Sequence, residues 1–280
     1  MSIACQCPNC SKKYKVPDKF AGKRVKCKEC GTAISIRQLQ TTKSKSGDRV
    51  LRHQPSKRAP EPVAGGGESA ELISAHFEEL LGQPQTILHE LVSSHVHLDV
   101  IVFEPKDDLR CYTLVTSGMS DQAMAAPPEA AGTEFAELML MLPEDWPMSK
   151  RAWKQNEAET YWPIRWLKQI SRLPHEYDTW VGSFHTIPNG DPAEPFGPNT
   201  DLCCWILMPM VLFPEELWKL DVDFEKQILF HLILPLYQEE VDFKLERGAE
   251  ELFGRLMKLQ PHDLWDFQRR NVCKKRFGIF

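Results

Sequence analysis

The sequence predicts one layered domain of mixed α/β (α+β) structure, with a central sheet flanked by helices, preceded by a small metal-binding segment. Apolar runs of strand length alternate with segments of helical spacing, and all eight tryptophans lie after residue 69, as one substantial core requires. Two closely spaced cysteine pairs near the N-terminus predict the metal-binding segment. The length of 280 residues fits about two units, at ~150 residues per domain.

The cysteine pairs come first along the chain. Cys7 and Cys10 form one C-x-x-C pair, Cys27 and Cys30 form a second, and sixteen residues separate the two. This spacing predicts a structural zinc site, because each short turn presents two thiolates and four thiolates complete a tetrahedral Zn²⁺ shell. Cys5 could replace Cys7 as a ligand, although the C-x-x-C pairing favours Cys7. A redox-active pair is the alternative.

The residues around these cysteines follow a known pattern, with Tyr14-Lys15-Val16-Pro17, Gly22-Lys23 and Val25 through Gly31 in order. Over residues 5–36 they resemble the short zinc-ribbon finger found at the N-termini of many bacterial proteins. The resemblance implies zinc at the four cysteines and no single function. We expect a ribbon over residues 1–37 and a flexible basic linker over residues 38–69, which is rich in Ser, Lys, Arg, Pro and Gly. Its glycine triplet lacks the flanking strand and Lys-Ser/Thr of a phosphate-binding loop.

The elements of the layered domain are predicted in order. Ser69 is expected to cap a helix that ends at Gly82. A strand is expected over residues 96–103. Pro163 begins a helix whose apolar residues recur at helical spacing up to Pro174. Further strands are expected over residues 111–116, 135–142, 180–187, 202–212 and 227–236, and a longer helix over about 238–258.

A series of short motifs runs through this region. It comprises His97-Leu98-Asp99-Val100, Phe103-Glu104-Pro105, Tyr112 to Asp121, Glu137 to Pro143 with Trp146, Trp162-Pro163, and Leu234-Pro235-Leu236 with Glu239-Glu240. In order and spacing the series resembles the suppressor-of-fused domain over about residues 72–259. The resemblance implies a mixed α/β sandwich that binds another protein and is no enzyme. We expect this domain over residues 70–260, with a basic C-terminal tail over residues 261–280.

The same resemblance bears on the partner. In animals the family member restrains a transcription factor by gripping a peptide between this domain and a second one, and only about twenty residues follow Lys258 here, so no animal partner is carried over. Bacterial members are mostly single-domain, and some resemble immunity proteins that neutralise a toxin by occlusion. The bacterial type of finger favours that setting.

Charge divides the chain near Val63. Residues 1–63 contain 15 Lys and Arg against 4 Asp and Glu, a net charge of +11, whereas the remainder contains 19 against 35, a net charge of −16. The acidic part predicts a basic protein partner, such as a toxin directed at nucleic acid. The basic part leaves open binding of DNA or RNA by the ribbon, or docking on another acidic surface.

Several polar clusters have sharper and plainer interpretations. His95, His97 and Asp99 could hold a metal on one face of a strand, but no fourth ligand is evident, so an ordinary exposed stretch is favoured. Ser117, Ser120 and Asp121 are favoured as a strand-ending turn that bonds its own backbone. The pairs Glu215-Glu216, Glu239-Glu240 and Glu250-Glu251 are favoured as solvated helix faces or helix starts. Cys203-Cys204 is favoured as a buried apolar part of a strand. The cationic tail is favoured as a solubilising terminus or as a strap lying on the acidic domain.

The leading prediction is therefore a non-enzymatic, cytoplasmic protein-binding module. It would act as an immunity-type or regulatory inhibitor that sequesters a protein partner and has no small-molecule substrate. No membrane span is expected, since the longest apolar run, Ile228 to Tyr237, falls short of the ~20 residues that a bilayer needs. The alternative is a nucleic-acid-associated regulator whose zinc ribbon binds DNA or RNA.

Overall fold

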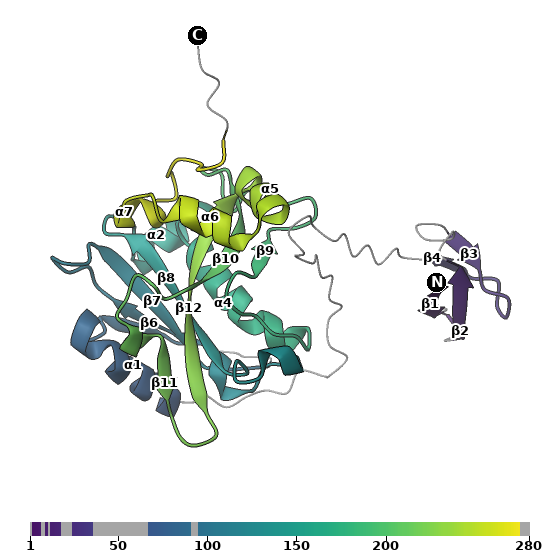
Figure 1. Cartoon of the computed structure of the whole chain (residues 1–280), viewed down its shortest axis with the longest axis horizontal. Coiled ribbons are helices and arrows are strands. Elements are labelled where there is room, and N and C mark those ends of the chain that lie inside the picture. The colour runs from purple at the N-terminus through teal and green to yellow at the C-terminus, as the bar shows by residue number, and fades with distance from the viewer. Residues whose placement is uncertain are drawn as a thin grey trace, which may run out of the picture. The chain divides into compact units, whose positions relative to one another are not determined.

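A computed structural model describes residues 2–6, 9–10, 12–17, 24–35, 67–90 and 95–274. The chain forms two compact units (Figure 1). In the first unit, β1 (Ser2–Gln6) pairs antiparallel with β2 (Lys13–Pro17), and β3 (Arg24–Lys26) pairs antiparallel with β4 (Ala33–Ser35). Among the residues described in both units, no helix combines the length and the apolar character that a membrane span requires.

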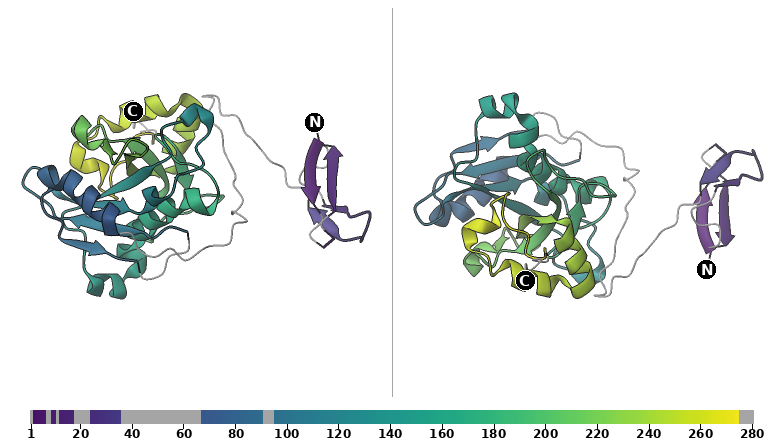
Figure 2. Two further views of the ribbon diagram at one scale, coloured as in Figure 1. Left: turned by 90° about the horizontal axis from the view of Figure 1, so that it is seen from below. Right: turned by 90° about the horizontal axis from the view of Figure 1, so that it is seen from above.

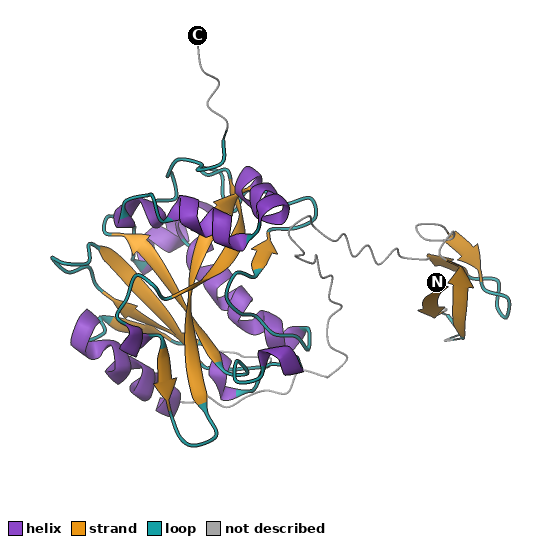
Figure 3. Cartoon of the chain, in the orientation of Figure 1, coloured by secondary structure: helices purple, strands orange, loops and turns teal. Residues whose placement is uncertain are grey.

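The second unit is built on one mixed sheet of eight strands (Figure 3). The order is β5 (Thr86–Leu88), β6 (Asp99–Phe103), β7 (Cys111–Ser117), β8 (Ala136–Pro143), β12 (Gln227–Tyr237), β10 (Leu202–Pro209) and β9 (Thr186–Pro188), while β11 (Lys219–Asp221) pairs with β12. Only β8 and β12 run parallel, so the chain between them must cross over. Every other pair is antiparallel.

Helices cover both faces of this sheet (Figure 2). One hydrophobic core lies beneath α1 (Gly67–Leu81), α5 (Gln238–Arg247), α6 (Ala249–Leu256) and α7 (Pro261–Leu264). The other lies beneath α4 (Trp162–Glu176), which follows α2 (Lys150–Gln155) and α3 (Glu157–Thr160). Short 3₁₀ turns span Met119–Asp121, Pro128–Ala130 and Glu215–Leu217. The predicted mixed α/β architecture, with a central sheet flanked by helices, is thereby confirmed.

Strand side chains alternate between the two cores. In β6, Ile101 and Phe103 belong to the first core, whereas Val100 and Val102 belong to the second. In β8, residues 136–142 are all buried, which is why this strand has a continuous apolar sequence rather than an alternating one.

Several element boundaries differ from the sequence prediction. The first helix begins at Gly67, so Ser69 lies inside it and does not cap it; its hydroxyl donates to Asp121 Oδ1 at 2.6 Å instead. Strand structure begins only at Asp99 in β6, and the strand expected over residues 180–187 is reduced to β9. Gly248, at φ +101°, divides the long C-terminal helix into α5 and α6.

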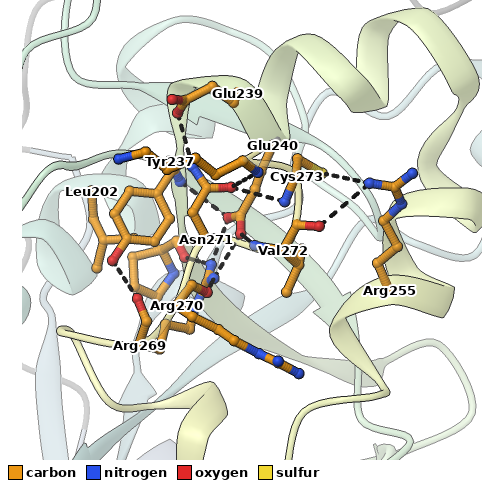
Figure 4. Close-up of polar contacts among 12 residues, drawn as sticks. Leu202, Tyr237, Glu239, Glu240, Arg255, Arg269, Arg270, Asn271, Val272 and Cys273 are labelled. Carbon is orange, nitrogen blue, oxygen red and sulfur yellow. Dashed lines mark hydrogen bonds and ion pairs between the residues drawn. The ribbon is translucent and has the colours of Figure 1, made fainter. Parts of the chain in front are cut away.

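A fully buried ion pair fastens the C-terminal segment to the sheet (Figure 4). Arg269 Nη1 and Nη2 donate to the two oxygens of Glu240, each at 2.7 Å, and both side chains have no exposed surface. Arg269 Nη2 also donates to the carbonyl of Pro235 on β12 at 2.8 Å, and the backbone N–H groups of Tyr237 and Val272 donate to Glu240. These bonds satisfy charges that burial would otherwise make costly.

The pair decides between alternatives that the sequence left open. Glu240 lies in the first turn of α5, as the helix-start interpretation expects, and is not on a solvated face. Arg269 binds the C-terminal segment to the second unit as a strap and does not merely solubilise the protein. Leu264, Trp265 and Phe267, just before Arg269, are also buried. Residues 261–272 are therefore packed into the second unit.

A second buried carboxylate, Glu137 on β8, has no exposed surface. Its Oε2 accepts the Thr116 hydroxyl proton at 2.6 Å, and its Oε1 accepts the backbone N–H groups of Gly118 and Ser120 and the Ser120 hydroxyl at 2.7–2.9 Å. Gly118 has φ +112°, and an added Cβ would lie 1.8 Å from the carbonyl oxygen of His97. Glu137 thus fixes the chain reversal that follows β7.

We expect Arg269→Met to destabilise the second unit by about 3–5 kcal/mol, because it leaves Glu240 buried without its partner. All eight tryptophans lie in this unit, so their fluorescence during urea unfolding reports on it directly. The control is Arg270→Met, which removes the same charge from an exposed neighbouring position. Equal unfolding midpoints for the two variants would contradict a stabilising role for the pair.

Glu137 predicts a pH dependence of stability. Burial raises the pKa of its carboxyl group, so the folded state holds this proton more tightly than the unfolded state does. The free energy of unfolding of the wild type should therefore fall, relative to Glu137→Gln, as pH rises above the ordinary glutamate value of ~4.3. Thermal unfolding measured from pH 4 to pH 8 tests this. Glu129→Gln is the control, because it removes one carboxyl group, as Glu137→Gln does, but from an exposed position. Parallel stability profiles for the wild type and Glu137→Gln would refute the prediction.

Candidate protein-binding groove and metal site

Strand β9 forms one edge of the eight-stranded sheet, and β10 is its partner on the inner side. The backbone N–H of Asn189 donates to the carbonyl of Cys203, and the backbone N–H of Leu207 donates to the carbonyl of His185. Within residues 185–189, the odd-numbered positions therefore face β10 with their backbone hydrogen-bonding groups. Thr186 lies opposite Ile206 between these bonds, and its N–H and C=O consequently point away from β10. The outer side of β9 thus offers backbone groups to an added strand.

A groove of about 520 Å³ runs beside this edge, between β9 and α4. Its walls contain three aromatic side chains, Trp166 and Tyr177 from the α4 region and Phe196 from the loop before β10. Trp166 and Phe196 meet edge to face with ring centroids 5.1 Å apart. The groove is also lined by charged, uncharged polar and apolar groups, from Arg165, Gln169, Ile170, Leu173, Glu176 and residues 187–190.

Local sequence explains how α4 supplies this wall. Pro163 lies in the first turn of the helix, and Ile164, Leu167 and Ile170 face the sheet with no exposed surface. Trp166, Gln169 and Leu173 fall on the adjacent stripe and line the groove. Pro174 lies in the last turn of α4, which continues to Glu176, so the helix extends slightly beyond its predicted end.

This geometry suits an extended peptide. An added strand would exchange backbone hydrogen bonds with Thr186, while its alternate side chains entered the aromatic groove beneath α4. Pro188, the last residue of β9, has no backbone N–H to donate. An added strand could therefore pair with only a short part of this edge. Sequence reasoning missed this groove, because a three-residue strand gives almost no periodic signal.

In the first unit, three of the four predicted zinc ligands come together. The sulfur atoms of Cys10, Cys27 and Cys30 all lie within 4.8 Å of one another, and Cys10 and Cys27 are 3.5 Å apart. Tetrahedral zinc with ~2.3 Å Zn–S bonds places its sulfurs ~3.8 Å apart, so these three thiols fit such an ion. The fourth predicted ligand, Cys7, lies outside the described residues.

The second strand of that unit adds Tyr14. Its hydroxyl lies 3.0 Å from Cys27 Sγ, and this hydrogen bond is the main cause of a lowered pKa of the Cys27 thiol. The same contact raises the pKa of Tyr14 to about 12. A hydrogen bond that stabilises the thiolate favours the form of cysteine that binds metal.

The stretch of His95, His97 and Asp99, favoured from the sequence as an ordinary exposed one, is half-buried at both histidines and buried at Asp99. Asp99 is buried and contacts two histidines, His89 Nδ1 at 3.0 Å and His97 Nε2 at 3.2 Å. Among the residues that the structure describes, Cys10, Cys27 and Cys30 form the only group of three whose ligand atoms converge closely enough for one ion. Asp99 therefore serves as a buried acceptor at the start of β6.

The predictions for the serine turn, the cysteine pair in β10 and the glutamate pairs were confirmed only in part. The favoured turn of Ser117, Ser120 and Asp121 was wrong in its bonding: Ser120 donates to Glu137, and Asp121 accepts from Ser69. Cys203 and Cys204 are buried in β10, as expected, and burial raises the pKa of both thiols. Glu215, Glu216, Glu239, Glu250 and Glu251 are exposed, in agreement with the solvated interpretation.

The fold and sites can be compared with known proteins. A family model described as Suppressor of fused protein (SUFU) matches residues 94–270. The crystal structure of a SUFU homologue from Neisseria gonorrhoeae is similar, with a TM-score of 0.55 and 14% identity over 75% of this chain and 100% of that chain. At this identity the likeness supports the fold alone.

Two further structures are more distant. The Sufu–Fu complex aligns with a TM-score of 0.48 and 13% identity, over 77% of this chain and 92% of that one. Drosophila Suppressor of Fused aligns with a TM-score of 0.47 and 12% identity, over 74% of this chain and 50% of that one. No curated protein sequence matches this chain significantly.

Proposed function

Because the chain belongs to the suppressor of fused protein family, we propose that it is a regulatory protein-binding module, without enzymatic activity, that sequesters an extended segment of a protein partner in the groove beside β9. The observation that carries this proposal is the combination of an open strand edge with an aromatic wall from α4. The edge would supply affinity through main-chain bonds, and the pockets along the wall would supply specificity.

Charge indicates the class of partner. Residues 64–280 have a net charge of −16, so a basic protein would be attracted before contact and oriented during the encounter. We propose an immunity-type role, in which the module occludes a basic toxin directed at nucleic acid. The alternative is a regulator whose basic N-terminal unit binds DNA or RNA, which the net charge of +11 over residues 1–63 favours.

The first unit is proposed to be a zinc ribbon with ligands Cys7, Cys10, Cys27 and Cys30. A chain segment this short buries too little apolar surface to fold alone, so the metal would supply its folding energy. Four thiolates leave no open coordination position, and the role of such zinc is structural.

The groove can be tested with a substitution that touches only its open edge. Thr186→Pro removes the outward N–H of β9 and keeps the bonds to β10, so partner affinity should fall at least roughly tenfold; Thr186→Val, which keeps the N–H, is the matched control. The partner is first identified by capture on the tagged full chain from native lysate, with and without nuclease. Its dissociation constant is then measured for the three proteins by calorimetry.

Two outcomes would count against the proposal. Equal affinities of the wild type and Thr186→Pro would remove the groove as the binding site. Recovery of partners that collapses on nuclease treatment would make nucleic acid the bridge and favour the alternative function.

The zinc site predicts one Zn²⁺ per full-length chain by native mass spectrometry. Cys27→Ser should abolish retention of the ion, because a hydroxyl is a poor substitute for a thiolate. Cys273→Ser, in the second unit, is the control and should keep one zinc. Comparison of Cys5→Ser with Cys7→Ser identifies the fourth ligand. Full zinc retention by Cys27→Ser would exclude the proposed ligand set.

A further inference from the structure

A second cavity, of about 830 Å³, shares no lining residue with the groove beside β9. It lies where the end of β8, the end of α3, the loop at residues 198–200 and the segment around α7 meet. Its lining comprises Arg110, Pro143, Glu144, Asp145, Trp146, Pro147, Glu159, Trp162, residues 198–200, His262 and residues 265–268. Neither the proposed peptide groove nor the metal site uses any of these residues.

The lining of this cavity includes a packed set of aromatic rings. Trp162 and Phe267 are buried with ring centroids 4.8 Å apart, and the half-buried Trp146 meets Phe267 nearly perpendicularly at 5.1 Å. The indole N–H of Trp146 donates to the carbonyl of Thr160 at 3.0 Å, which fixes the orientation of that ring. Trp265, 7% exposed, adds a fourth ring to the lining.

The rim of the cavity is acidic. Arg110 donates Nε and Nη2 to the two oxygens of Glu144, at 2.9 and 2.5 Å, so these two charges neutralise each other. Asp145, Glu159 and Asp266 are exposed, and within residues 95–274 none of the three forms an ion pair with a cation. His262, the other basic residue of the lining, lies 3.1 Å from Asp263. Asp266 Oδ1 accepts the backbone N–H of Gln268 at 2.8 Å, so Asp145, Glu159 and the second oxygen of Asp266 remain for a ligand.

Aromatic rings beside carboxylates that form no ion pair among the described residues favour a cation. The face of tryptophan attracts cationic groups through its quadrupole, and planar guanidinium groups both stack on such rings and bind carboxylates in a bidentate manner. An anionic ligand would meet three like charges, and an uncharged apolar ligand would leave them desolvated. The volume exceeds that of one side chain, so a short segment with more than one cation matches the three carboxylates.

We propose that this cavity is a second docking site, which binds an arginine-bearing segment of a basic protein partner. One arginine would stack against the Trp146 and Trp265 region while neighbouring cations pair with Asp145, Glu159 and Asp266. The ion pair of Arg269 with Glu240 holds residues 265–268 in place and so preforms one wall of the cavity. If one partner reaches both the cavity and the groove beside β9, binding at one site makes binding at the other intramolecular and so raises the overall affinity.

The test uses a fluorescently labelled, capped peptide of three arginines alternating with glycine, titrated with the full-length chain at low salt. The double variant Asp145→Lys/Glu159→Lys should weaken binding at least roughly tenfold relative to wild type. The control, Glu129→Lys/Glu225→Lys, makes the same change in net charge at exposed positions outside the cavity and should stay within about threefold. A peptide with glutamate in place of arginine should show no binding.

The aromatic contribution has its own variant. Trp146→Leu should weaken binding of the arginine peptide more than binding of a lysine peptide of equal length, because the planar guanidinium group stacks on the ring and the ammonium group does not. Thermal unfolding of Trp146→Leu checks that the fold is retained. If Trp146→Leu does not fold, the carboxylate double variants still decide whether the cavity binds the peptide.

Three outcomes would overturn the inference. Wild-type chain that does not bind the arginine peptide up to about 1 mM has no such site. Equal weakening by the two lysine double variants would show only diffuse attraction to an acidic surface. Loss of peptide binding in Thr186→Pro would place the peptide in the groove beside β9, whereas unchanged binding separates this site from the proposed function.

Discussion

Strand β12 lies inside the sheet and has buried side chains over almost its whole length, so polar groups placed near it must find partners within the protein. Glu240, three residues beyond the end of β12, meets this requirement through Arg269, and Glu137 on the neighbouring β8 meets it through Thr116, Gly118 and Ser120. Each network draws a separate piece of chain onto the sheet. The C-terminal segment and the turn after β7 are positioned in this way.

This constraint also limits where the sheet of the second unit leaves backbone groups available for pairing. Helices cover both faces of the sheet, so backbone bonding is available only at an edge, and β9 presents such an edge beside the aromatic wall of α4. One wall of the second cavity also depends on a buried polar contact. Residues 265–268 line it because Arg269, directly after them, is held by Glu240.

The two units have opposite net charge and different interiors. The second unit folds around two hydrophobic cores and has an acidic composition, whereas the first unit is basic and gathers three thiols at one point. A small unit of this kind is typically completed by a metal, while a large unit needs none. Binding of protein partners and of metal would thus be assigned to separate parts of one chain.

Local sequence patterns were sufficient to predict the elements with a strong periodic signal. Continuous apolar runs predicted β7, β8, β10 and β12, helical spacing predicted α1 and α4, and the spacing of Cys10, Cys27 and Cys30 predicted a thiol cluster. These features depend on residues close together along the chain, which is what periodicity and spacing record.

Which polar residues are buried depends on contacts between segments that are distant along the chain. Glu239 and Glu240 are adjacent and chemically identical, yet one is exposed and the other has no exposed surface, because Arg269 approaches only one of them. The same holds for Ser120, in the turn after β7, which donates to Glu137 on the adjacent strand β8, and for the short edge strand β9. Such contacts join residues 17 to 29 positions apart, and their partners are set by strand order, which no local pattern encodes.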